Sequence, residues 1–196
     1  MLTKTIIENI LIIVAEAFWV SSCWTQLRRL VKTHNPKGLS APSQTLNAAG
    51  NIAWATYFFS RGLFVPVITN LTMMLITLGT LFYILGNKKQ FVKGIVAIAI
   101  VGPITSYILI VHPSVAGWLG VAYNLIAATP WVLHVVITKK VSGISERSFY
   151  FSLSAMLCTL TYALLIVSIP LIVGCLLGLA YTSVIMGYYY KYRKHD

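Results

Sequence analysis

Long apolar runs separated by short polar stretches dominate this sequence. They predict helices near residues 5–25, 39–60, 64–86, 94–112, 115–138, 145–168 and 169–190. Each run approaches the roughly 20 residues that cross a hydrocarbon core of roughly 30 Å. Lys88 and Lys89 interrupt the pattern after the third run, and Pro170 favours a tight turn between the last two. The pattern therefore predicts seven transmembrane helices joined by short loops.

The composition agrees with a membrane protein. Of the 196 residues, 58% are hydrophobic and 10% are charged, whereas about a quarter of a soluble domain is charged. We therefore expect an all-α integral membrane protein without a separate catalytic or DNA-binding domain. Glu8 and Glu16 interrupt the first run and no clear small-residue cleavage site follows, so we expect a retained helix rather than a signal peptide.

The basic residues predict the orientation. Thirteen lie in alternate connections and at the C-terminus, against Lys4 and Arg61 on the other side. The thirteen are Arg28, Arg29, Lys32 and Lys37 in the first loop, Lys88, Lys89 and Lys93 in the third, Lys139, Lys140 and Arg147 in the fifth, and Lys191, Arg193 and Lys194 at the end. The positive-inside rule then predicts an external N-terminus and a cytoplasmic C-terminus. Orientation and anionic-lipid contact explain the net charge of +11 without nucleic acid.

An internal repeat divides the chain. A shift of 105 residues aligns the corner Gly38-Leu39-Ser40 with Gly143-Ile144-Ser145, and Thr56-Tyr57 with Thr161-Tyr162. The shift carries the first three helices onto the last three. We therefore expect two parallel triple-helix bundles, 1–87 and 115–196, joined by a linker helix within 88–114.

Few residues could support catalysis. The acids are Glu8, Glu16, Glu146 and Asp196, too few and too scattered for a paired-carboxylate or Ser-His-Asp site. The three cysteines lie inside apolar runs, without a CxxC motif. We expect no enzyme, cofactor or metal.

A polar stripe marks the helix near 39–60. Ser40, Ser43, Asn47, Asn51 and Trp54 are spaced by three or four residues and share one helical face. Such a face points into a bundle or a water-filled path. The helix near 145–168 repeats it as Ser145, Ser148, Ser152 and Thr159, with Met156 in the place of Asn51. The alternative is interhelical hydrogen bonding, favoured for the serines, whereas a pocket is favoured for Asn47, Asn51 and Trp54.

These segments resemble a known family. Thr25-Gln26-Leu27, a basic loop, Gly38-Leu39-Ser40 and Trp54-Ala55-Thr56-Tyr57 are similar to the PQ-loop pattern of the SWEET and SemiSWEET superfamily. Thr129-Pro130-Trp131, Gly143-Ile144-Ser145 and Tyr162-Ala163 form a similar second copy. The resemblance covers nearly the whole chain and implies a facilitator that moves a small solute by alternating access.

The resemblance also implies residue roles. Trp54 and Asn70 match the family's pocket pair in the first repeat, while Thr159 and Cys175 stand where the second Trp and Asn would be. Pro42 and Pro130 match the family's hinge prolines. Thr25 and Arg147 occupy the other two hinge places.

The pocket chemistry favours a small neutral solute, with a mono- or disaccharide as the first choice. An indole face suits the CH surface of a sugar and an Asn amide both donates and accepts hydrogen bonds. Thr159 and Cys175 favour a smaller or less hydroxylated solute, or a one-sided pose. Asn124, before Pro130, is a further pocket candidate, and Glu16 is a candidate for proton coupling inside a span.

Two alternatives remain open. One is a proton-coupled PQ-loop transporter of amino acids or cationic solutes, and the other is a ligand-binding sorting receptor similar to the KDEL receptors. The expected partners are a small-molecule substrate and the lipid bilayer, with the chain as a monomer or homo-oligomer. Compact loops favour a bacterial inner or plasma membrane.

Overall fold

The computed structural model describes residues 2–86 and 111–193, with isolated positions between them. This part of the chain forms six α-helices and no strands. They are α1 (Leu2–Thr33), α2 (Ala41–Ser60), α3 (Phe64–Leu85), α5 (Pro113–Thr138), α6 (Glu146–Leu165) and α7 (Ile169–Tyr192). The expected linker helix over 94–112 falls almost entirely outside the described residues.

Five of these helices are long and apolar enough to cross a membrane, which makes the chain an all-α integral membrane protein. They are α1, α3, α5, α6 and α7. α2 is more polar than these five, in agreement with the polar stripe noted in its sequence. Its 20 residues still span about 30 Å, and its polar Gln44, Asn47 and Asn51 line an internal cavity described below.

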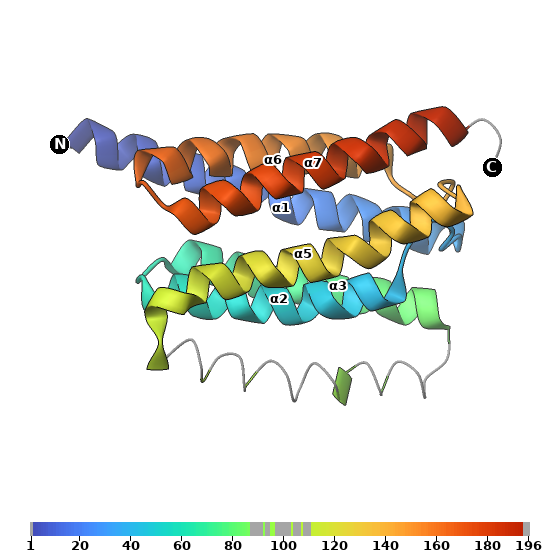
Figure 1. Cartoon of the computed structure of the whole chain (residues 1–196), viewed down its shortest axis with the longest axis horizontal. Coiled ribbons are helices and arrows are strands. Elements are labelled where there is room, and N and C mark those ends of the chain that lie inside the picture. The colour runs from blue at the N-terminus through green and yellow to red at the C-terminus, as the bar shows by residue number, and fades with distance from the viewer. Residues whose placement is uncertain are drawn as a thin grey trace.

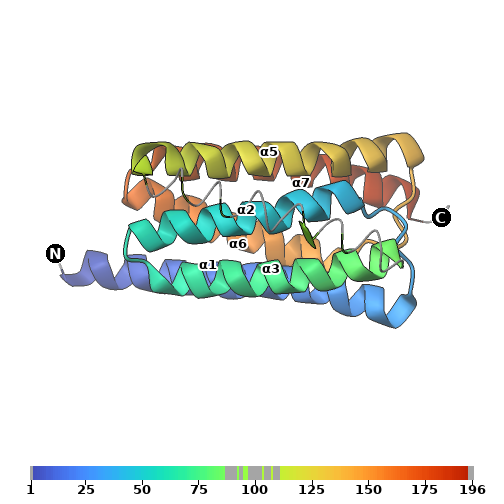
Figure 2. The same cartoon turned by 90° about the horizontal axis from the view of Figure 1, so that it is seen from below.

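The six described helices lie side by side along one long direction (Figure 1). Each packs against two others, in the order α1, α3, α2, α5, α7, α6 and back to α1. Figure 2 shows α1 beside α3 on one side of the molecule and α5 beside α7 on the other. α1 begins and α7 ends at opposite ends of the molecule. The helices therefore close a ring around a central axis.

The 105-residue spacing seen in the sequence also holds for the helix boundaries. α2 and α6 both contain 20 residues, and their first residues, Ala41 and Glu146, are 105 positions apart. α3 and α7 begin the same distance apart, and so do the ends of α1 and α5. The left-handed backbone at His34 recurs at Lys139, and that at Gly62 recurs at Val167. The two halves of the chain thus share one local structure.

The end of α1 differs from our expectation. We placed Arg28, Arg29 and Lys32 in a loop, but α1 continues to Thr33. Leu, Arg, Gln and Lys are good helix formers, and the first strong breaker in this stretch is Pro36. The basic residues still gather at one end of the ring, where α1, α5 and α7 finish.

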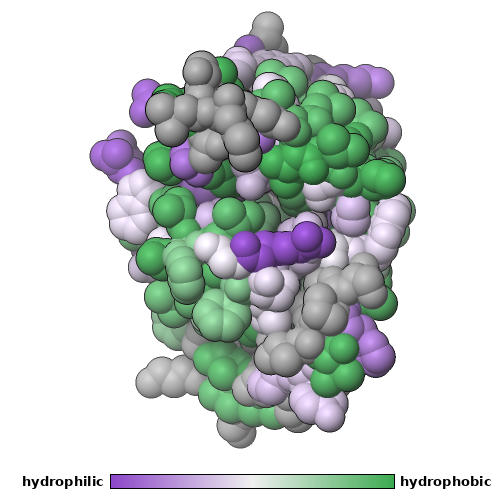
Figure 3. All heavy atoms as spheres, turned by 90° about the vertical axis from the view of Figure 1, so that its left-hand side faces the viewer, coloured by the Kyte–Doolittle hydropathy of each residue, from purple (hydrophilic) through white to green (hydrophobic). Residues whose placement is uncertain are grey.

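Two apolar clusters lie toward opposite ends of the ring. The aromatic cluster, where α2 and α6 finish, is formed by Ile12, Ala53, Trp54, Tyr57, Phe58, Val121, Tyr162, Ala163 and Leu171. The loop cluster, at the basic end, is formed by Leu30, Leu39, Val135, Val141, Ile144, Phe149, Ile185 and Tyr189. Each cluster takes residues from both halves of the chain. Figure 3 views the molecule from the end where α1 begins and shows apolar surface between scattered hydrophilic side chains.

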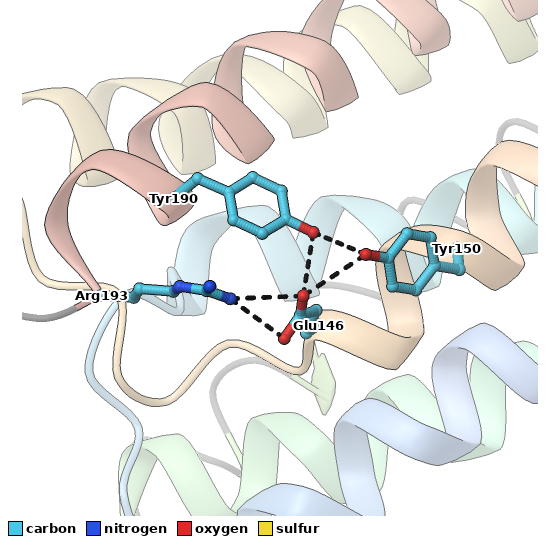
Figure 4. A network of polar contacts seen from close by, with 4 residues as sticks. All are labelled: Glu146, Tyr150, Tyr190 and Arg193. Atoms are coloured by element: carbon cyan, nitrogen blue, oxygen red, sulfur yellow. Dashed lines mark hydrogen bonds and ion pairs between the residues drawn. The ribbon is translucent and has the colours of Figure 1, made fainter.

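A polar network ties the start of α6 to the end of α7 (Figure 4). The Tyr190 hydroxyl donates to Glu146 Oε1 over 2.9 Å, and the Arg193 guanidinium lies 3.4 Å from the same atom. The hydroxyls of Tyr150 and Tyr190 are 2.8 Å apart. All four side chains are on the surface, where such an ion pair contributes about 1 kcal/mol or less. The network fixes two neighbouring helices and is not part of the cavity.

Candidate functional site

A cavity of about 310 Å³ lies inside the helix ring and is lined by all six described helices. This volume is near the lower limit of ligand pockets, which range from about 300 to 1,000 Å³. The cavity lies between the aromatic cluster and the loop cluster, because its lining residues include Trp54 and Leu171 from one and Ile185 from the other. Its position and size suit a small solute.

α2 presents its polar stripe to this cavity. Ser43, Asn47, Asn51 and Trp54 line it, whereas Ser40 is the N-cap of the helix and accepts a hydrogen bond from the Ser43 backbone N–H. Within the described part of the chain, the amides of Asn47 and Asn51 have no hydrogen-bond partner. Amide groups that line a membrane-embedded cavity in this way are available to a solute.

Trp54 is held at the edge of the aromatic cluster. Its ring stacks on Phe58, with 5.7 Å between centroids, and meets the edge of Tyr57 at 5.6 Å. The ring also covers Gly120 of α5, where an added Cβ would lie 2.6 Å from a ring atom. The missing side chain at Gly120 therefore sets how closely the indole approaches α5.

Asn70 and Cys175 occupy matching places on α3 and α7. Both are buried and both line the cavity. The Asn70 amide nitrogen donates to the Pro66 carbonyl over 2.8 Å, so one of its two N–H bonds is used within α3. Cys175 is a free thiol, a much weaker hydrogen-bonding group than an amide. The two sides of the cavity thus differ in polarity at this level.

α1 contributes a face made of Glu16, Trp19, Cys23 and Gln26. Glu16 is 6% exposed, and its Oε2 atom has no hydrogen-bond partner within the described residues. Among the described residues that line the cavity there is no Lys, Arg or His. A buried carboxyl group without a cationic partner is expensive in a membrane, which makes Glu16 a candidate functional residue.

Serines join α1 to α6. The Ser22 hydroxyl lies 2.8 Å from that of Ser148 and 2.6 Å from that of Ser152, and the Ser148 hydroxyl donates to the Ser22 carbonyl. All three side chains border the cavity. Their hydroxyls are used between the helices, as the interhelical alternative predicts.

Hydrogen bonds between the two halves close the basic end. Gln26 donates to the Gly143 carbonyl over 3.0 Å and accepts from the Ser145 backbone N–H over 2.8 Å. Arg29 donates to the Ser142 carbonyl. On the opposite side of the ring, the Trp131 indole donates to the Gly38 carbonyl over 2.9 Å. The loops after α1 and α5 are therefore bonded to each other or to the opposite half.

Most residues that line the cavity form pairs that lie 105 positions apart in the sequence. The pairs are Glu16 and Val121, Trp19 and Asn124, Cys23 and Ala128, Gln26 and Trp131, Ser43 and Ser148, Asn47 and Ser152, Asn51 and Met156, Trp54 and Thr159, Asn70 and Cys175, Met73 and Gly178, Ile76 and Tyr181, Thr77 and Thr182, and Thr80 and Ile185. Equivalent positions of both halves thus face one cavity. Their chemistry differs, because Glu16, Asn51 and Asn70 oppose apolar or weakly polar partners.

The structure brings together every residue that we expected to bind the solute. These are Trp54, Asn70, Asn51, Asn47, Thr159, Cys175 and Asn124, and Glu16 lines the same cavity. The four hinge candidates lie outside it. Thr25 is inside α1, Pro42 is in the first turn of α2, Pro130 is inside α5, and Arg147 is exposed in the first turn of α6.

Our sequence analysis missed Trp19 and the linking role of Gln26. The signal was present, because the 105-residue shift that relates the two halves pairs Trp19 with Asn124, which we had selected. In residues 2–86 and 111–193, no group of three His, Cys, Asp or Glu side chains is arranged to hold a metal ion. No protein-family model, curated protein or solved structure matches the chain.

Proposed function

We propose that this protein is a membrane transporter of SWEET-like architecture that moves a small neutral solute by alternating access. In this proposal α1–α3 and α5–α7 are two parallel triple-helix bundles joined by a linker helix. The observation that carries the proposal is the pairing of cavity residues across the 105-residue register. A cavity that two equivalent halves build together is the arrangement that repeat-based transporters place near the middle of the membrane.

The two ends of the cavity support alternating access. The aromatic cluster and the loop cluster each combine residues of both proposed bundles. Rocking one bundle against the other would separate one cluster while the other stays packed. The basic end, with Arg28, Lys32 and Lys37, faces the cytoplasm in this proposal, and the aromatic cluster faces the outside.

The favoured solute is a mono- or disaccharide. Asn47, Asn51 and Asn70 place amides around one side of the cavity, and Trp54 supplies an aromatic face. Hydroxyl groups of a sugar pair with amides, while its CH surface covers an indole. No charged group on the solute is required for this fit.

Thermal unfolding of the purified full-length protein tests the proposal. The wild type is heated with D-glucose, sucrose, amino acids and nucleosides at millimolar concentrations, beside Trp54→Ala and Asn70→Ala. A solute that binds the folded state raises the melting temperature by mass action. We expect a sugar-dependent rise that both variants lose. A rise only with amino acids would contradict the sugar proposal.

One observation favours a second function, proton-coupled transport of an amino acid or a cationic solute. Glu16 is buried in the cavity, and its Oε2 atom is unpartnered among the described residues. A carboxyl group of this kind could bind and release a proton during the transport cycle. Uptake into liposomes driven by a pH gradient tests it. Glu16→Gln abolishes the driven uptake if the protein is coupled, and leaves passive flux intact if it is a facilitator.

A further inference from the structure

The cavity has a second indole, that of Trp19, which our sequence analysis did not select. Trp54 and Thr159 occupy equivalent positions in the two halves, so the second half lacks an indole at this level. However, the Trp19 indole of α1 donates its Nε1–H to Thr159 Oγ1 over 3.3 Å. Because Thr159 and Trp54 are equivalent, the indole of Trp19 lies at about the depth of Trp54.

The order of helices in the ring places these two indoles on opposite sides of the cavity. Trp19 lies where α1 packs on α6, since its partner Thr159 belongs to α6. Trp54 lies where α2 packs on α5, against Gly120. Around the ring, the helices follow the order α1, α3, α2, α5, α7, α6, so these two helix contacts lie on opposite sides of it. Both side chains line the cavity.

Thr159 is used as an anchor. Its hydroxyl donates to the Ala155 carbonyl over 2.8 Å while it accepts from Trp19. A hydroxyl has one proton to donate, so Thr159 retains no donor for a solute. The equivalent of Trp19 in the second half is Asn124, a smaller polar residue that also lines the cavity. Each side of the cavity therefore holds one indole and one smaller polar residue.

We propose that Trp19, positioned by Thr159, is the second aromatic wall of the solute site, and that a pyranose ring binds between the indoles of Trp19 and Trp54. This inference rests on the proposed transport function and names the part of the solute that is recognised. Trp19 borders one side of the bound sugar ring and Trp54 the other, and the surrounding amides bind its hydroxyl edge. Thr159 is a positioning residue that does not itself contact the sugar.

Binding measurements with D-glucose test the two roles. The apparent Kd follows from the concentration dependence of the melting temperature of the purified full-length protein. We expect Trp19→Ala to weaken binding at least tenfold, and Trp24→Phe, which alters an exposed indole on the same helix, to leave it unchanged. Glucose binding by Trp19→Ala with the Kd of the wild type would overturn the inference while the transport proposal stands.

A double-mutant cycle separates anchoring from direct contact. Trp19→Phe removes the indole N–H and Thr159→Val removes its acceptor. If Thr159 acts through Trp19, the double variant binds glucose no more weakly than either single variant, because both remove the same hydrogen bond. Additive losses would show that Thr159 contacts the sugar and would overturn its assignment as a positioning residue.

Fluorescence quenching tests the position of Trp19 without any solute. Acrylamide quenches indoles that water reaches, and brominated lipids quench indoles that face the bilayer. Relative to the wild type, Trp19→Phe should lose an acrylamide-quenched component and Trp24→Phe a lipid-quenched component. If Trp19 is instead quenched by lipid, the inference is overturned even if no sugar binds. If no sugar stabilises the wild type, the sugar proposal fails, and quenching alone decides the position of Trp19.

Discussion

Gly120 provides a sensitive test of the packing that shapes the cavity. An alanine Cβ at this position would lie 2.6, 2.8 and 2.9 Å from three atoms of the Trp54 ring. Such contacts are shorter than real Cβ contacts, so the ring must move. It has little room, because Phe58 stacks on it and Tyr57 meets its edge. Gly120→Ala should therefore displace the indole from its place beside the cavity.

Two opposing effects set the magnitude. Alanine in place of glycine inside a helix stabilises by about 0.5–1 kcal/mol. Forcing an extra carbon into a packed core costs about 1–3 kcal/mol. The overpacking cost is the larger of the two, so we expect Gly120→Ala to lower the free energy of unfolding by about 1–2 kcal/mol. The displaced indole should also weaken solute binding.

Thermal unfolding of the purified protein measures the effect, with Gly187→Ala as the matched control. Gly187 is also helical, and nothing lies within 4 Å of an added Cβ there. The control should keep or slightly raise the melting temperature, whereas Gly120→Ala should lower it. Equal melting temperatures for the two variants would refute the assignment of Gly120 as the space that the Trp54 ring requires.

Two further predictions concern the links between the halves, and a third concerns the turn between α6 and α7. Gln26→Leu removes the hydrogen-bond partner of both the Gly143 carbonyl and the Ser145 N–H. It should lower the free energy of unfolding by about 1–3 kcal/mol for each group left unpaired. Thermal unfolding beside Gln44→Leu checks this, and an equal drop in melting temperature for the two variants would contradict it. Gly143→Ala would place a Cβ against the carbonyl oxygens of Asn35 and Lys37, so its folded yield on size-exclusion chromatography should fall well below that of Gly187→Ala, which has nothing within 4 Å of an added Cβ. Val167→Gly removes a β-branched residue at φ 54° and should stabilise by up to about 1 kcal/mol; a lower melting temperature would argue against strain in this turn.

The sequence predicted the six described helices well because their boundaries depend on local signals. Pro170 and the turn at Gly62 mark changes of direction that apolar runs alone leave vague. The predicted end of α1 was wrong because Arg and Lys are good helix formers. A helix that continues past its apolar run leaves no signal in the hydropathy pattern. The polar stripe on α2 predicted a face that points into the bundle, and Asn47 and Asn51 do line the cavity.

The lining of the candidate site was predictable on α2, where spacing places polar residues on one face, whereas Asn70 on α3 was selected only through the family resemblance. The role of Gln26 was harder to predict, because its hydrogen-bond partners are backbone groups of a loop more than a hundred residues away. The role of Trp19 depends on a contact with Thr159 across two helices, which no local pattern encodes. Internal repetition was the one sequence signal that related distant parts of the chain. Applied from the second half to the first as well, it would have selected Trp19 as the equivalent of Asn124.

Solute exchange in proteoliposomes tests the central claim most directly. Liposomes containing the wild-type protein are loaded with unlabelled D-glucose and diluted into buffer with labelled D-glucose, so that exchange accumulates label inside without any ion gradient. We predict accumulation by the wild type and its loss in Asn70→Ala and Trp54→Ala variants that fold normally. Saturable glucose binding without any accumulation would contradict transport and favour a receptor. Accumulation that both variants retain would show that the solute does not pass through this cavity.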